Sequence, residues 1–358
     1  MDAAAFRDEF PVLARVAYLN AGTDGPMPQR GYDAALARMR HELEAGRAGR
    51  EHWDGLTAMA DSLRERLAGL LGCAVSDVAL THSTTDGLAT VLSALPLGPG
   101  DEVVTSDEEH PGLLAPLAAA RRRNGFDVRV VPFGELAGAV GPRTRLVACS
   151  HVSWVGGCVV DAEALAQTDA MVVLDGAQGL GAVSVDVQAL GCDFYAASGQ
   201  KWLCGPDGTG CLYVRPEIAN TLDPPWPGYP SLADATEPLD LVVHEGARRF
   251  DLGPKAGPAT AWALAAVELL EEAGIDWVTE RAATQAARLA DLLRERDHDV
   301  AERGRSTLVS WHSDDPEGDV DRLRADAIVL RHLPGRGLLR ASVGAWTSDG
   351  ELERLAAA

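Results

Sequence analysis

The stretch that decides the fold runs from residue 171 to residue 206 and holds two segments of one kind, MVVLDGAQG at 171–179 and DFYAASGQKWLCGP at 193–206. Each segment begins as a short apolar run, which is typical of a buried strand, and ends in a polar turn that contains glycine. Ligands of open parallel sheets gather outside the carboxyl ends of the strands. We therefore expect Asp175 and Lys201, which follow these two strands, to share one edge of a sheet.

Similar apolar runs flank this stretch, and helical periodicity fills most of the intervals between the earlier ones. Strands that alternate with helices predict an α/β fold, with a mainly parallel, doubly wound sheet covered on both faces. The predicted strands are 78–81, 102–105, 128–132, 145–149, 171–175, 194–197 and 210–214, and the predicted helices are 88–95, 113–123 and 162–167.

Residues 219–250 interrupt this rhythm, because the proline-rich run DPPWPGYP at 223–230 cannot form a regular element. We interpret it as a long surface or interface loop. A large domain is predicted over residues 16–245, and a smaller α+β domain over residues 1–15 and 246–358. Within the smaller domain we expect helices at 259–273 and 277–295, a strand at 307–311, an acidic loop at 314–319, a helix at 320–326, a strand at 338–342 and a helix at 349–355.

Composition excludes several classes of protein. The 358 residues are 46% hydrophobic and 24% charged, which is ordinary for a folded chain, and the formal charge is −21. A surface this acidic repels phosphate backbones and anionic membranes, so we expect neither nucleic acid nor a membrane as a partner. The six cysteines show no CxxC pair and no zinc-like spacing, so no metal is expected. The amino terminus resembles no secretory signal, and these features together predict a cytoplasmic protein.

Lysine chemistry is easy to assign because the chain contains only two lysines, Lys201 and Lys255. Lys201 follows a predicted strand, where its amine could form a Schiff base with a carbonyl group. Asp175 ends an all-apolar strand, where a buried carboxylate needs a cation such as the protonated nitrogen of a pyridine ring. Gln178, on the following turn, could reach a hydroxyl group of that ring. A surface lysine and an aspartate that caps a helix or turn are the alternatives for the first two residues.

Two further segments fit the same kind of ligand. Thr84 and Thr85 precede a predicted helix, and small hydroxyl residues at a helix N-terminus suit a phosphate group. Plain N-capping would use the same residues. His110 ends the segment EVVTSDEEHP at 102–111, where an imidazole could stack on a planar ring. Its acidic neighbours fit a surface loop equally well.

Taken in order, these residues resemble the pattern of fold type I enzymes that use pyridoxal 5′-phosphate (PLP). More narrowly, the chain resembles the class V aminotransferase family, which includes cysteine desulfurases, selenocysteine lyases, kynureninase-like enzymes and isopenicillin N epimerase-like proteins. The resemblance runs from YLNAG at 18–22 to LRAS at 339–342. It implies a mainly parallel, seven-stranded-type sheet in a large domain with a smaller α+β C-terminal domain. It also implies a homodimer whose sites lie near the interface, and residues 224–230 are expected to form part of that contact.

The resemblance implies a role for each site residue. Lys201 would form the Schiff base with the cofactor and later move the proton on Cα of the substrate, and His110 would stack on the ring. Asp175 would hold the pyridine nitrogen, and Gln178 would contact the ring oxygen O3′. The other implied contacts are phosphate binding by Thr84, Thr85, Ser198 and Gln200, and binding of the substrate carboxylate by Arg340 beside Asn20.

Three departures from the family pattern bear on the reaction. Cysteine desulfurases need a nucleophilic cysteine on a mobile loop shortly before the final Arg-x-Ser, and residues 326–340 contain none. Trp154 ends a segment that is similar to one in desulfurases, where asparagine stands at this position. Pro254 replaces a threonine that relatives offer to the phosphate from the partner subunit, and Lys255 could supply a positive charge in its place.

The absent cysteine disfavours a desulfurase that forms a persulfide on the enzyme. The resemblance favours a lyase that acts on a cysteine-derived or otherwise β-substituted amino acid by β-elimination. Transamination is the nearest alternative, followed by epimerisation and kynureninase-like hydrolysis. The alternative to an enzyme is a non-catalytic scaffold that binds PLP. The intact set of Asp175, Gln178 and Lys201 disfavours this alternative.

Overall fold

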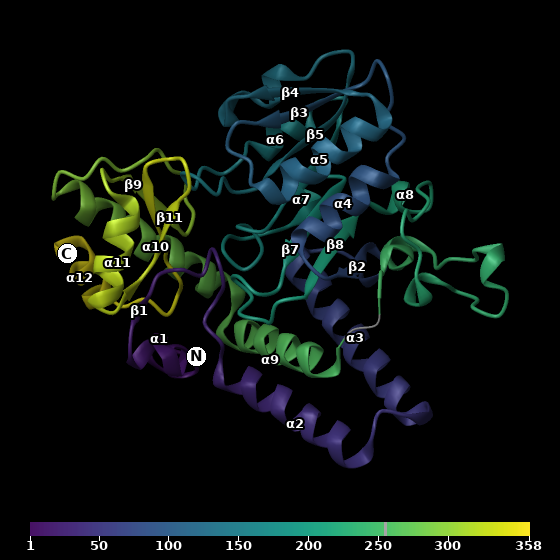
Figure 1. Cartoon of the computed structure of the whole chain (residues 1–358), viewed down its shortest axis with the longest axis horizontal. Helices are drawn as coiled ribbons and strands as arrows, with labels where there is room; N and C mark the ends of the chain where they lie inside the picture. The colour runs from purple at the N-terminus through teal and green to yellow at the C-terminus, as the bar shows by residue number, and fades with distance from the viewer. Residues whose placement is uncertain (254–255) are drawn as a thin grey trace.

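A seven-stranded sheet forms the centre of the larger of two lobes in the computed structural model, which describes residues 1–253 and 256–358 (Figure 1). The spatial order is β2-β8-β7-β6-β5-β3-β4, and every neighbouring pair is parallel except the two pairs that contain β8. The prediction of a mainly parallel sheet of this size is confirmed. The strands are β2 (Val78–Thr81), β3 (Glu102–Ser106), β4 (Asp127–Val131), β5 (Thr144–Ser150), β6 (Met171–Asp175), β7 (Phe194–Ser198) and β8 (Gly210–Val214).

Two hydrophobic cores cover the two faces of this sheet, because successive side chains of a strand point to opposite faces. In β6, Val172 belongs to the core that includes α3 (Gly49–Leu71), whereas Val173 belongs to the core beneath α4 (Thr84–Ala94) and α5 (Pro111–Asn124). Burial on both faces explains why an inner strand such as β6 is apolar until its final aspartate. The short helices α6 (Ala162–Ala166) and α7 (Val187–Leu190) complete the connections between the strands.

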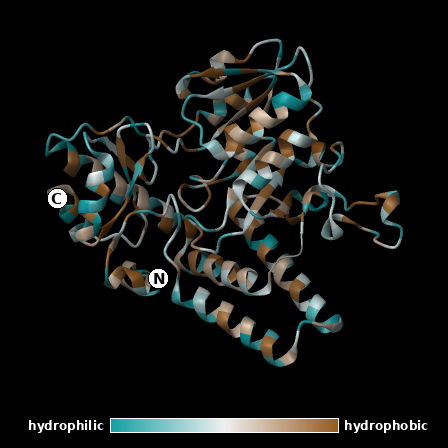
Figure 2. Cartoon of the chain, viewed as in Figure 1, coloured by the Kyte–Doolittle hydropathy of each residue, from teal (hydrophilic) through white to brown (hydrophobic). Residues whose placement is uncertain are grey.

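Three long helices lie side by side along one edge of the larger lobe, as Figure 1 shows for α2, α3 and α9. The sequence predicted α9 (Gly257–Ala273) but neither α2 (Gln29–Ala45) nor α3. Helix α2 escaped prediction because its apolar residues do not mark a buried face: Met39 and Leu43 are exposed, and Figure 2 shows such hydrophobic positions along the helix.

The smaller lobe is built on the three-stranded antiparallel sheet β11-β12-β9, beside which β1 pairs with β10 in parallel. One correction concerns the acidic loop predicted at 314–319. Asp315 caps helix α11 by accepting from the Gly318 amide, so the helix already begins at Pro316. The elements are α1 (Ala3–Asp8), β1 (Ala17–Tyr18), α10 (Ile275–Arg294), β9 (Leu308–His312), α11 (Pro316–Ala325), β10 (Ile328–Val329), β11 (Arg331–Leu333), β12 (Leu338–Ser342) and α12 (Asp349–Ala357).

The division of the chain into residues 16–245 and the two flanking segments stays a prediction. Helix α9 packs against α2 and α3, and β1 pairs with β10, so chain segments on both sides of the predicted boundaries meet. Between α8 (Pro216–Ala219) and α9 the described chain forms only short 3₁₀ turns, as expected for a proline-rich loop. None of the helices in the described ranges is long and apolar enough to cross a membrane.

Candidate active site

A cavity of about 200 Å³ opens at the carboxyl ends of β2, β6 and β7. The N-terminal loop around Gly22 and strands β11 and β12 of the smaller lobe close it from the other side. Within the described residues, every predicted site residue lines this cavity except Asn20, whose side-chain oxygen accepts from Thr23 Oγ1 at 2.9 Å. The lining residues are Gly22, Thr23, Ser83, Thr84, Thr85, His110, Trp154, Asp175, Ala177, Gln178, Ser198, Gln200, Lys201, Arg331 and Arg340.

Lys201 lies in the turn that follows β7, and the backbone holds this turn tightly. The Gly25 amide donates to the Gln200 carbonyl at 2.7 Å, and a Cβ atom at Gly25 would lie 2.1 Å from the Lys201 carbonyl oxygen. Burial lowers the pKa of Lys201 to about 8, although the Asp175 carboxylate opposes this shift. The neutral amine, which is the nucleophilic form, is therefore accessible near neutral pH.

Asp175 ends β6 in register with Ser150 of β5 and Ala196 of β7. One carboxylate oxygen accepts from the Ala177 amide at 2.9 Å. Burial raises the pKa of Asp175, and the charge of Lys201 acts in the opposite direction. A buried carboxylate with so little stabilisation fits a cationic ligand group, such as a protonated pyridine nitrogen.

The start of α4 and the end of β7 form a cradle for an anion. Gly210 of β8 is in register with both Thr81 and Ser198, and a Cβ atom there would lie 2.6 Å from the Ala197 carbonyl oxygen. The hydroxyls of Thr84 and Ser198 are buried without a hydrogen-bond partner among the described residues. Free hydroxyls beside a helix N-terminus fit a phosphate group. Pro254 and Lys255, also predicted near the phosphate, lie outside the described residues.

Arg340 is only 1% exposed, and Nη1 donates to the Trp154 carbonyl at 2.8 Å. Its Nε and Nη2 atoms have no partner in the described structure. Burial, and then the charge of Arg331, lower the pKa of Arg340 to about 9. A buried guanidinium with free N–H groups beside a like charge is stabilised by a carboxylate.

His110 and Trp154 meet edge to face, with ring centroids 5.0 Å apart. The His110 Nδ1 atom accepts from the Gly112 amide at 2.9 Å, and burial lowers the pKa of this imidazole to about 4. The neutral ring faces the cavity without adding charge to it. Its role in stacking stays a prediction.

Glu109 is a buried acid that the sequence analysis did not single out. Its carboxylate accepts from Ser106 Oγ at 2.5 Å and from Ser150 Oγ at 2.6 Å. Burial raises the pKa of Glu109 to about 7, and the nearby Asp175 contributes to this shift. Since Glu109 precedes His110 and both serines end neighbouring strands, this contact fixes the loop that carries the imidazole.

Arg331 was also missed, although the hairpin pattern contains the signal that places it. It stands opposite Arg340 in the antiparallel pair β11-β12, and residues opposite each other in such a pair share one face of the sheet. Arg331 Nη1 donates to Thr23 Oγ1 at 3.3 Å, and the nearby Asp24 carboxylate partly balances its charge.

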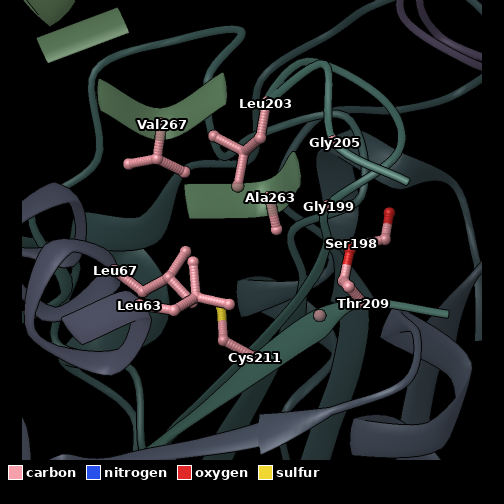
Figure 3. Close-up of a pocket in the computed structure, with 11 residues that line it drawn as sticks. Leu63, Leu67, Ser198, Gly199, Leu203, Gly205, Thr209, Cys211, Ala263 and Val267 are labelled. Atoms are coloured by element: carbon pink, nitrogen blue, oxygen red, sulfur yellow. The ribbon is translucent and has the colours of Figure 1, made fainter. Parts of the chain in front are cut away.

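A second, small apolar cavity of about 20 Å³ lies behind the turn at Ser198 and Gly199. Figure 3 shows Leu63 and Leu67 of α3 on one side of it and Val267 of α9 on the other. These helices thus support the turn that holds Lys201 with hydrophobic side chains, and Trp262 of α9 also donates to the Cys204 carbonyl of that turn at 2.9 Å.

Comparison with known proteins agrees with this geometry. The family model "Aminotransferase class-V" matches residues 18–355. Isopenicillin N epimerase from Amycolatopsis lactamdurans is 30% identical over 98% of this chain and 96% of its own length. A cysteine desulfurase from Enterobacter sp. (strain 638) is 31% identical over 76% of this chain and 73% of its own length. A solved complex of the cystine C–S lyase C-DES with its reaction product cysteine persulfide has a TM-score of 0.91 and 28% identity, with 97% of this chain and 98% of that chain covered.

Proposed function

Since the chain belongs to the class V aminotransferase family and is a PLP-dependent enzyme, we propose that it is a lyase that cleaves the carbon–sulfur bond of a cysteine-derived amino acid by β-elimination. When bound, PLP supplies an aldehyde that takes up an amine and a ring that accepts an electron pair. In this proposal Asp175 holds the ring nitrogen, Gln178 contacts O3′, and His110 stacks on the ring. The phosphate is bound by Thr84, Thr85, Ser198 and Gln200.

The substrate is oriented by Arg340, whose two free N–H positions suit an α-carboxylate, with Asn20 beside it. Lys201 removes the proton on Cα. The Cβ–S bond then breaks, and sulfur leaves with the bonding electron pair. The remaining three-carbon product is released and reacts with water to give pyruvate and ammonia, so no oxidant or reductant is needed.

The observation that supports elimination over desulfuration is the absence of a thiol at the site. All six cysteines lie in the described ranges, and none of them lines the cavity. Leu333 of β11 pairs with Leu338 of β12, so only a short turn joins the two strands. This turn leaves no loop that could carry a sulfur acceptor into the cavity. An eliminating lyase needs no such acceptor.

Turnover of cysteine derivatives without any keto acid tests this proposal. We expect L-cystine or an S-substituted L-cysteine to yield pyruvate, ammonia and a sulfur product over many turnovers, while the visible spectrum of the bound cofactor persists. A single equivalent of keto acid, with loss of that spectrum, would identify a transaminase. Inversion at Cα without pyruvate would identify an epimerase, and either result would overturn the proposal.

Arg331 supplies a reason to expect a substrate with a second anionic group. It lines the cavity, shares one face with Arg340, and is half-buried. In this proposal Arg340 binds the α-carboxylate, which leaves Arg331 for an acidic group at the far end of the substrate. L-cystine carries such a carboxylate, and the similar protein C-DES is described as a cystine lyase.

We expect Arg331→Gln to raise the KM for L-cystine by about 10- to 100-fold, the equivalent of a lost hydrogen bond between charged groups. The KM for S-methyl-L-cysteine, which has no distal charge, should change by less than about 3-fold. Arg296→Gln, on the surface, is the matched control. Equal increases in KM for both substrates would show that Arg331 does not bind the distal carboxylate.

We also infer that the enzyme is a homodimer. Two large hydrophobic side chains between residues 219 and 250 are exposed to solvent, with Tyr229 80% and Leu239 99% exposed. Tyr229 and Trp53 of α3 line a further cavity of about 220 Å³. Apolar surface of this extent favours association. Sedimentation equilibrium is expected to give twice the chain mass of 37.8 kDa, and a monomer at micromolar concentration would contradict the inference.

A further inference from the structure

We infer that Trp202 is a positioning residue that fixes the orientation of the Gln178 side-chain amide, and thereby which of its atoms faces O3′ of the cofactor. Trp202 follows Lys201 directly in the chain, but it points away from the substrate side and does not line the cavity. The inference rests on the proposed contact between Gln178 and O3′.

The hydrogen bonds around Gln178 allow only one orientation of the amide. Trp202 Nε1 donates to Gln178 Oε1 at 3.0 Å, and Gln178 Nε2 donates to the Gly22 carbonyl at 2.8 Å. An indole N–H can only donate, and a backbone carbonyl can only accept. A flipped amide would place its nitrogen against the indole N–H and its oxygen against the carbonyl, and both hydrogen bonds would be lost.

Both partners are themselves held in place. Trp202 is 3% exposed and Gln178 is 4% exposed, so water does not compete for these hydrogen bonds. Gly181 has a left-handed φ of 83°, and a Cβ atom there would lie 3.1 Å from Trp202 Cβ. A Cβ atom at Gly22 would lie 2.9 Å from Gln178 Oε1. Glycine at these two positions thus allows the close packing that brings the three groups together.

The fixed orientation leaves one N–H of Gln178 free for the cavity. A donor at this position stabilises the negative charge on O3′, whereas a flipped amide would present a repelling oxygen. Stabilising the anionic oxygen lowers the pKa of the lysine-bound cofactor. Trp202 therefore acts on that pKa through Gln178, without touching the cofactor.

The test is a titration of the visible absorbance of the holoenzyme against pH. Trp202→Phe keeps the buried ring but removes the N–H, and we expect it to raise the pKa of the bound cofactor by about one unit, the equivalent of one hydrogen bond to a charged oxygen. Gln178→Leu should raise it by at least as much. Trp346→Phe is the matched control, because Trp346 is also buried and its Nε1 also donates a hydrogen bond, in this case to the backbone carbonyl of Tyr18 at 3.3 Å in the smaller lobe.

The double variant separates the inference from the role of Gln178. If Trp202 acts through Gln178, Trp202→Phe adds no further shift in the Gln178→Leu background. A shift in Gln178→Leu but not in Trp202→Phe would overturn the inference and leave the Gln178 contact standing, and no shift in either would overturn both. The charged and titratable groups that line the cavity, and Asp24 and Glu109 close to them, stay unchanged in every variant; the lining groups are His110, Asp175, Lys201, Arg331 and Arg340.

Discussion

Replacing Lys201 with alanine is expected to lower turnover by about 10⁴-fold, because one amine both holds the cofactor and moves the substrate proton. Lys201 is the one lysine among the residues that line the cavity. The variant should also lose the visible absorbance of the lysine-bound cofactor. Absorbance spectra and steady-state pyruvate formation measure the two effects on the same sample.

The composition of the chain provides an unusually clean control. Lys255 is the only other lysine, so Lys255→Ala removes the alternative amine completely. Borohydride reduction of the wild-type enzyme, followed by mass spectrometry of its peptides, should place the cofactor on the peptide that contains Lys201. A Lys201→Ala variant that keeps its visible colour and its reducible adduct would refute the assignment.

Much of the sheet could be predicted because burial on both faces leaves a direct trace in the sequence. The run at 171–175 matches strand β6, and the turn residues that follow it reach the cavity as expected. The residues that were missed act across the fold. Arg331 reaches the site only through its register opposite Arg340, and Trp202 only through a contact with another loop. The position of Arg331 follows only from the register of the hairpin, and the contact between Trp202 and Gln178 depends on how two separate loops meet.

The charge of the site differs from the charge of the molecule. The chain carries a formal charge of −21, yet Lys201, Arg331 and Arg340 face one cavity. A cationic cleft in an acidic protein attracts anions locally while the rest of the surface repels them. This arrangement suits a phosphate-bearing cofactor and a substrate with one or more carboxylates.

Asp175→Asn is expected to lower kcat by about 10²- to 10³-fold while the cofactor stays bound. The substitution keeps the size of the side chain and removes the negative charge that stabilises a protonated ring nitrogen. The phosphate cradle at Thr84 and Ser198 is untouched, so the cofactor content should remain near one per chain. Asp193→Asn is the matched control: this buried aspartate accepts from the Val172 amide at 2.7 Å at the opposite end of the same strands.

When the cofactor is removed, the Asp175→Asn substitution is expected to stabilise the folded protein. Burial raises the pKa of Asp175, so the folded apoprotein binds more protons than the unfolded chain between the ordinary and the raised pKa. Its stability therefore falls as pH rises through that window, and an asparagine avoids this loss. We expect the Asp175→Asn apoprotein to unfold at a higher temperature than the wild-type apoprotein at pH 8. A lower unfolding temperature together with unchanged kcat would show that Asp175 supports the fold and not the chemistry.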